Sequence, residues 1–289
     1  MATSPETKQK LDVPSDLLYR AKSEFISDWD VHQTYIQNFD AYEAMLIGEV
    51  YDSVSKSIDS TKITDSYATT LARERADRVM AKLPDGTTEA VGQKDQGKAA
   101  FMDILRQKWW YANANAQHPF QEKLNMVQFY SSVYGYMPVF VDWNVSPQGY
   151  AGPDMWIWSP RMLVPQQGRT SLSDMEHATG LTYVSKQFLK DIRDNLSEDD
   201  GWNAEALDLL IANCDQTWAW DVDYDTKISR DRTQSPVKKG IMLATRYEAG
   251  LNGRWITFAP DHGFIEVRNL KNPHKNARIP FVAKYSMPL

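Results

Sequence analysis

The chain has little of what a secreted, membrane-spanning or nucleotide-hydrolysing protein needs. It contains one cysteine, Cys214, among 289 residues, so it can form no internal disulfide, and a lone thiol fits a reducing compartment. No apolar run approaches the roughly eighteen residues that a membrane-spanning helix requires, and we expect no membrane partner. Phosphate-binding glycine loops, the dinucleotide fingerprint and the serine nucleophile elbow are also missing. These absences argue against an ATPase motor and against several large classes of enzyme.

Metal-binding patterns are equally scarce. The five histidines lie far apart and form no paired zinc motif, so we interpret them as single buried or exposed side chains. Asp221, Asp223 and Asp225 share one face of a predicted strand, where carboxylate oxygens could bind Mg²⁺ or Ca²⁺. The segment fails as a calcium loop, because Thr226 replaces the required glycine and Arg232 the bidentate glutamate. An exposed strand face is the favoured interpretation. We therefore predict no catalytic residue, metal or cofactor and no enzyme, with a metal-dependent hydrolase as the weaker alternative.

What the chain does have is a globular composition with many large aromatic residues. Hydrophobic residues make up 42% and charged residues 24%, and there are ten tryptophans and fourteen tyrosines. Aromatic side chains serve cores and interfaces alike, so this excess favours a protein that assembles. The formal net charge of −6 argues against a sequence-reading DNA-binding protein, which is usually basic. It remains compatible with a channel through which DNA slides.

The first half of the chain predicts helices. Residues 1–14 are polar and predict a flexible arm. Ser15 and Asp16 can cap a helix whose helical pattern continues to about residue 58. We interpret its aromatic stripe, which includes Tyr35, Phe39 and Tyr42, as a core face. The helix that follows from about residue 65 carries alternating charges, which indicate a solvated surface.

Residues 96–144 predict two helices that lead into one buried strand and together form a scaffold. In the first helix Phe101, Ile104 and Leu105 recur at helical spacing and predict a packed face. Gly135 is placed to end the second helix in a left-handed turn. The strand that follows, from about residue 136 to residue 143, is rich in β-branched and aromatic residues.

The second half changes from helical spacing to alternation. Ser185 and Asn203 are expected to cap two helices. From about residue 218 apolar and polar residues alternate, and turn-rich segments at 250–253 and 260–263 predict two hairpins. The sequence therefore predicts an α+β fold, helix-rich first and β-rich last.

Basic residues gather in the last fifty or so positions, interleaved with aromatic residues. They offer either the outward faces of ordinary hairpins or a docking surface for an acidic partner or a phosphate backbone, and both interpretations stay open. As candidates for contact with a partner or DNA we select Lys238, Lys239, Arg246, Arg254, Arg268 and Lys271.

Several segments in succession resemble the portal proteins of tailed bacteriophages, the head-to-tail connectors of the virion. A charged helix ends in a Leu-Pro turn, a helix closes on Val-Tyr-Gly at 133–135, and a strand ends in Phe-Val-Asp-Trp at 140–143. Ser-Pro-Arg-Met-Leu-Val-Pro at 159–165 and Ile-Pro-Phe-Val at 279–282 also match segments of that family. The resemblance covers residues 65–289 in order and spacing.

The resemblance implies an N-terminal part of a portal subunit. Such subunits form rings, usually of twelve copies, at one capsid vertex, and double-stranded DNA passes through them without sequence readout. The expected partners are other copies of the chain, the major capsid protein, the terminase large subunit and the neck adaptor, with location in the virion after assembly in the host cytoplasm. The expected regions are a wing-like 15–184, a helical connection with an acidic strand at 185–236 and a clip-like 237–289. The apolar, strand-like ending predicts a fragment of a longer chain, and another structural or assembly protein of a virion is the alternative.

Overall fold

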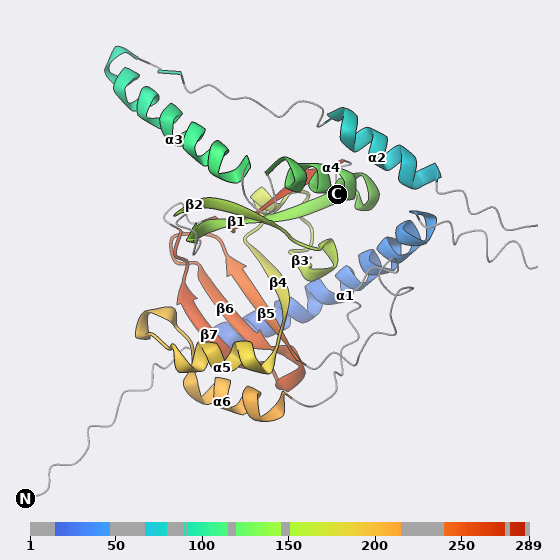
Figure 1. Cartoon of the computed structure of the whole chain (residues 1–289). Coiled ribbons are helices and arrows are strands. Elements are labelled where there is room, and N and C mark those ends of the chain that lie inside the picture. Colours follow the sequence, from blue (N-terminus) through green and yellow to red (C-terminus); the bar gives the residue numbers. More distant parts are fainter. Residues whose placement is uncertain are drawn as a thin grey trace, which may run out of the picture.

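The computed structural model describes residues 15–46, 67–79, 89–90, 92–114, 120–145, 151–214, 240–274 and 278–286. Helices dominate the first half and antiparallel strands the second (Figure 1). The predicted α+β class is therefore confirmed, with a helix-rich part followed by a β-rich part.

Helix α1, Ser15–Leu46, is a 32-residue helix that begins where the sequence predicted. Phe25, Trp29 and Phe39 are buried on one side of it. Phe25 packs edge-on against Phe258 of a strand, with ring centroids 5.4 Å apart. The helix is thus fixed to the β-rich part of the chain by its apolar face, the usual source of helix stability in a protein.

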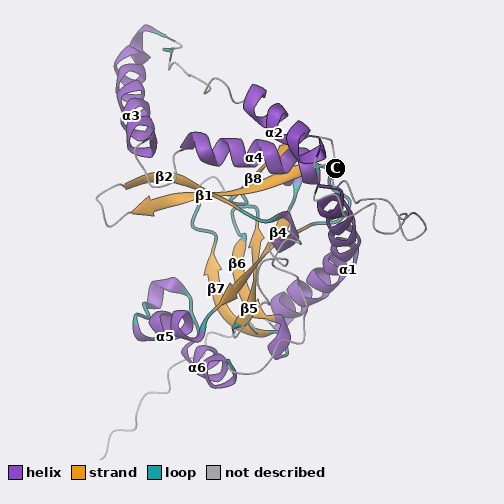
Figure 2. Cartoon of the chain, turned by 45° about the vertical axis from the view of Figure 1, so that its right-hand side comes forward, coloured by secondary structure: helices purple, strands orange, loops and turns teal. Residues whose placement is uncertain are grey.

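A five-stranded antiparallel sheet forms the larger half of the fold. Across the sheet its strands are β3 (Leu163–Pro165), β4 (His177–Val184), β5 (Ile241–Glu248), β6 (Arg254–Ala259) and β7 (Ile265–Lys271). Because side chains alternate along a strand, Met242 and Ala244 of β5 pack towards α1, whereas Ile241 and Leu243 pack in the opposite cluster. That second cluster includes residues of helices α5 (Lys186–Asp194) and α6 (Ala204–Asn213). Figure 2 shows α1 and the α5–α6 pair on opposite sides of this sheet.

The local signals for α5 and α6 behave as predicted. The Ser185 side chain accepts a hydrogen bond from the amide of Phe188, and Asn203 caps α6 through the amides of Glu205 and Ala206. Cys214, at the end of α6, is buried as a small apolar side chain.

A three-stranded sheet in the order β2–β1–β8 forms the smaller half. It consists of β1 (Tyr136–Val145), β2 (Ala151–Ile157) and β8 (Phe281–Tyr285). Helix α4 (Phe120–Tyr134) ends at Gly135, whose φ of 83° is the predicted left-handed turn. The chain then returns as β1 beneath α4, so that helix and strand pack on each other.

Helices α2 and α3 lie on the same side of the three-stranded sheet as α4 (Figure 1). They span Tyr67–Val79 and Gln96–Ala114. Helix α3 extends away from both sheets at the upper left of Figure 1 and approaches the rest of the fold near the start of α4.

The regions that the resemblance predicts, 15–184 and 237–289, both contribute strands to each of the two sheets. Strands β5 to β7 extend the sheet that β3 and β4 begin, and β8 pairs with β1, where Phe281 is opposite Phe140. An aromatic cluster joins the two sheets, with the Phe281 ring 5.3 Å from that of Tyr247. In the part of residues 237–289 that the structure describes, the strands therefore pair with strands of the wing-like region.

Strand β4 begins at His177 and includes Gly180. Gly180 weakens the strand signal of β4. Tertiary packing accounts for the glycine, because a Cβ there would lie 3.2 Å from the ring of Tyr247.

Candidate assembly surface

The basic residues selected from the sequence do not share one exposed face. Lys238 and Lys239 lie outside the described residues. Arg246 is 1% exposed and pairs with Glu24 of α1 and, at 2.9 Å, with Glu248. Its guanidinium is turned into the protein, so in this fold it holds α1 against β5 instead of facing a partner.

Three further basic candidates lie on the strands β6 and β7. The Nε of Arg254 donates to the side chain of Asn269 at 2.5 Å. The Nε of Arg268 donates to the carbonyl of Asp200 at 2.8 Å, the guanidinium lies 5.0 Å from the Trp202 ring, and burial lowers the pKa of Arg268. Lys271, at the end of β7, is exposed. Of these three side chains Lys271 is the most open to a partner.

The acidic strand that could have held a metal cannot be placed. Asp221, Asp223 and Asp225 all lie outside the described residues. Among the residues that are described, no three His, Cys, Asp or Glu side chains lie together as a metal site would require.

One buried charge cluster connects α1 to the larger sheet. The Nε2 of His177 on β4 lies 2.9 Å from an Asp28 carboxylate oxygen, and its Nδ1 is 3.8 Å from Glu24. Since Glu24 also pairs with Arg246 of β5, one turn of α1 is bound by charge to two neighbouring strands. Charge-assisted hydrogen bonds of this kind fix the orientation of the elements that they connect.

A second buried cluster connects α1 to α4 and to the turn before β3. Arg161 pairs with Asp40 at 2.7 Å and with Glu43 at 3.1 Å. The Tyr134 hydroxyl donates to Glu43 at 2.5 Å, and burial together with this hydrogen bond raises the pKa of Tyr134. His32 Nε2 donates to the Arg161 carbonyl at 3.1 Å. These groups are mutually paired, which indicates a structural role in holding α1 rigidly.

A groove of about 830 Å³ runs beside strand β8. Its lining includes Trp143 of β1, Arg278 and Tyr285. Strand β8 is the last strand of its sheet, so the backbone groups on its outer side are not paired within that sheet. The groove therefore mixes apolar side chains with polar backbone atoms.

Helix α3 carries an apolar stripe on its solvent side. Phe101, Met102, Ile104 and Leu105 are between 43% and 59% exposed. The sequence predicted that this stripe would be packed, and that prediction is wrong for the single chain. Figure 1 shows the physical reason, because α3 projects from the fold and no other described helix or strand covers this side of it. Exposed apolar surface of this kind marks interaction sites in soluble proteins.

A second exposed stripe lies on the C-terminal half of α1. Val31, Tyr35, Tyr42 and Met45 are between 41% and 56% exposed. The sequence predicted a core face that includes Tyr35, Phe39 and Tyr42. Phe39 is buried as predicted, whereas the prediction is wrong for Tyr35 and Tyr42. Helix α1 has two apolar stripes, and among the described elements the sheets and α4 cover the stripe that contains Phe39.

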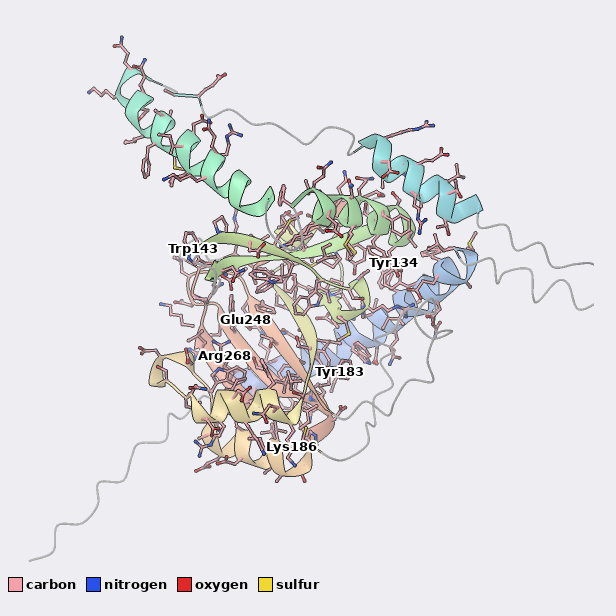
Figure 3. All side chains as sticks on the ribbon, in the orientation of Figure 1. Tyr134, Trp143, Tyr183, Lys186, Glu248 and Arg268 are labelled. Atoms are coloured by element: carbon pink, nitrogen blue, oxygen red, sulfur yellow. The ribbon has the colours of Figure 1, made fainter. Side chains whose placement is uncertain are left out.

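Strand β1 is exposed in the part that helix α4 no longer covers. Met137 and Val139 are buried in a cluster with Val127 of α4. Trp143, on the same strand face by alternation, is 64% exposed, and Figure 3 places it at the far end of the small sheet. The predicted buried strand is therefore buried at its beginning and open at its end.

Comparison with known proteins adds no relative to this geometry. No protein-family model matches the chain, and the search of curated proteins finds no match. Among the described helices, none combines the length and the apolar character needed to cross a bilayer. What the fold defines is an α+β scaffold whose helices α1 and α3 present apolar surface outward.

Proposed function

We propose that the chain is a structural subunit of a portal-like ring at a capsid vertex, where it forms a channel for DNA packaging and ejection. The observation that carries this proposal is the pair of exposed apolar stripes on α3 and α1. A single copy leaves both stripes in water, and association that buries them is favourable by about 25 cal/mol per Å² of apolar area before the costs of association. The succession of portal-like segments between residues 65 and 289 supports the same function.

The chain's charge is compatible with a DNA channel. A surface rich in lysine and arginine binds phosphates tightly and with a strong salt dependence. A chain with a net charge of −6 instead repels the DNA backbone on average, which allows sliding. In the proposed assembly the terminase large subunit, the neck adaptor and the major capsid protein are the protein partners, and the assembled ring belongs to the virion.

Mass by light scattering, combined with negative-stain class averages of the same sample, tests the proposal. Closed rings of about twelve copies with a central hole wide enough for duplex DNA are the expected result. Assemblies without a central hole would favour another structural protein of a virion. A chain that stays monomeric at high concentration contradicts the ring.

Chelation separates the structural function from the hydrolase alternative. The structural subunit is expected to have the same thermal stability with and without EDTA, and Asp223→Asn is expected to leave it unchanged. A hydrolase that uses Asp221, Asp223 and Asp225 requires a divalent metal for activity and would be stabilised by it.

A further inference from the structure

We propose that α3 of one copy docks on the outward stripe of α1 of a second copy. This contact would place Phe101, Ile104 and Leu105 of one chain against Val31, Tyr35 and Tyr42 of the next. The inference rests on the proposed function, because it names the contact that would link neighbouring subunits.

The apolar area favours a protein partner. Four half-exposed side chains of this size leave on the order of 400 Å² of apolar surface on each helix, given that a large aromatic residue buries 150–250 Å². A standard interface needs roughly 800 Å² from each partner, so the helix pair would supply about half of one. Residues around the two helices would have to supply the remainder, as polar rims do in stable interfaces.

The positions of the two stripes require two copies. Helix α3 and the C-terminal half of α1 lie on different sides of the chain in both Figure 1 and Figure 2. One copy therefore cannot bring its own stripes together without refolding. Each copy would offer α3 to one neighbour and accept α3 from another, which is a head-to-tail contact. Contacts of this type close into rings or continue as filaments.

The charges on the two helices are complementary. Lys98 and Lys108 of α3 are exposed. Lys98 pairs with Asp95 at 3.3 Å and Asp103 with Arg106 at 3.0 Å, which leaves Lys108 as the positive charge nearest the stripe for which the described residues show no ion pair. On α1, Asp30 next to Val31 is exposed. The acidic residues Asp28, Asp40 and Glu43 pair inside the chain with His177 or Arg161 and do not contribute to this surface. A lysine beside one stripe and Asp30 beside the other favour α3 against α1 over α3 against a second α3.

The decisive experiment uses one substitution in each stripe. Ile104→Glu introduces a carboxylate on α3, and Tyr42→Glu introduces one on α1. Both sites are exposed in the single chain, so the far-UV circular dichroism and the melting temperature should stay close to those of the wild type. We expect the dissociation constant of self-association, measured by sedimentation velocity, to rise at least about tenfold in each variant alone. A charge at the centre of an apolar contact loses its hydration without gaining a partner, which weakens the contact.

Mixing the two variants distinguishes this contact from other interfaces. The Ile104→Glu chain keeps an intact α1, and the Tyr42→Glu chain keeps an intact α3, so the mixture should form dimers with one chain of each kind and nothing larger. Gln96→Glu on α3 and Gln37→Glu on α1 make the same charge change at exposed positions outside the stripes. These controls should assemble as the wild type does.

Other outcomes overturn the contact. Rings that persist in both variants would leave the portal function standing and eliminate only this contact. A mixture that stays monomeric would also eliminate it, whereas a wild-type chain that never associates would contradict both proposals.

A cysteine pair gives a second measurement that does not depend on weakened association. The native Cys214 is buried and is a poor target for an external oxidant. The double variant Ile104→Cys/Tyr42→Cys should form a ladder of disulfide-linked multimers on a non-reducing gel. Ile104→Cys alone and Tyr42→Cys alone should give no ladder, and a double variant without a ladder would overturn the proposal.

Discussion

The guanidinium of Arg246 on β5 and the carboxylate of Glu24 on α1 form an ion pair between residues 222 positions apart. The Arg246 side chain is 1% exposed, whereas Glu24 keeps partial contact with solvent. Arg246 was selected from the sequence as a candidate contact for a partner. Its position shows instead that the first helix and the larger sheet are held together by buried charge as well as by apolar packing.

Arg246→Met tests this relationship. Removing a buried guanidinium leaves Glu24 and Glu248 without their shared partner, and we expect the free energy of unfolding to fall by about 2–4 kcal/mol. Chemical denaturation followed by tryptophan fluorescence measures the loss. Arg193→Met is the matched control, because Arg193 pairs with Asp208 at the surface and its removal should leave stability almost unchanged. Equal losses in the two variants would contradict a structural role for the buried pair.

His32 should make the fold sensitive to mild acid. Burial lowers the pKa of His32 to about 4, and within the described residues its Nδ1 has no hydrogen-bond partner. The unfolded chain takes up this proton near pH 6.5, while the folded chain resists it until about pH 4. Stability is therefore present above pH 6.5 and falls as the pH drops towards 4, by about 3 kcal/mol in total.

His32→Gln removes that titration and supplies the comparison. The difference in unfolding free energy between wild type and variant should depend on pH between 6.5 and 4 and level off above 6.5. Parallel stability curves over that range would show that His32 is not the group responsible.

Asp261 should make the fold less stable as the pH rises towards neutrality, which is the opposite of the effect of His32. Burial raises its pKa to about 6, and neither carboxylate oxygen has a hydrogen-bond partner among the described residues. The protonated form stabilises the fold at low pH, and this contribution is lost as the pH rises from about 4 through 6. Asp261→Asn should therefore raise the free energy of unfolding at pH 7 by about 1–2 kcal/mol, discounted for partial exposure. A destabilised Asn variant in thermal melts at pH 7 would contradict this.

Substitutions at Gly201 and Gly263 allow the cost of backbone strain to be measured apart from the cost of a steric clash. Both have positive φ, 68° and 69°, but a Cβ on Gly201 would lie 2.6 Å from the carbonyl oxygen of Asn269. A Cβ on Gly263 would meet no atom of the described residues within 4 Å, its two neighbours in the chain aside. Gly263→Ala should cost about 1 kcal/mol for the left-handed conformation alone. Gly201→Ala should cost about 3 kcal/mol, and similar losses in thermal unfolding would refute the steric argument.

Local signals in the sequence predicted elements well where they involve neighbouring residues. The caps at Ser185 and Asn203 and the left-handed turn at Gly135 all depend on groups a few positions away. These features need no knowledge of the rest of the fold.

Features that depend on distant partners could not be predicted from the sequence. Nothing near Arg246 indicates that its charge is buried against Glu24. The stripe of α3 has the spacing of a core face. That Phe101 and Leu105 are exposed follows from the arrangement of the described elements, none of which covers them. The pairing of Phe140 with Phe281, which joins regions that the sequence placed on either side of residue 237, also gives no local signal.

The pairing of β8 with β1 also has a consequence for synthesis on the ribosome. Phe140 can pair with Phe281 only after the ribosome has synthesised the chain between them. At 5–20 residues per second this takes roughly 7–28 s. During this time the small sheet has only the two strands β1 and β2, which alone are marginal in water. The side of β1 that will receive β8 is then an open edge that can pair with another nascent chain. Slow translation of the last strands should therefore increase aggregation in the cell.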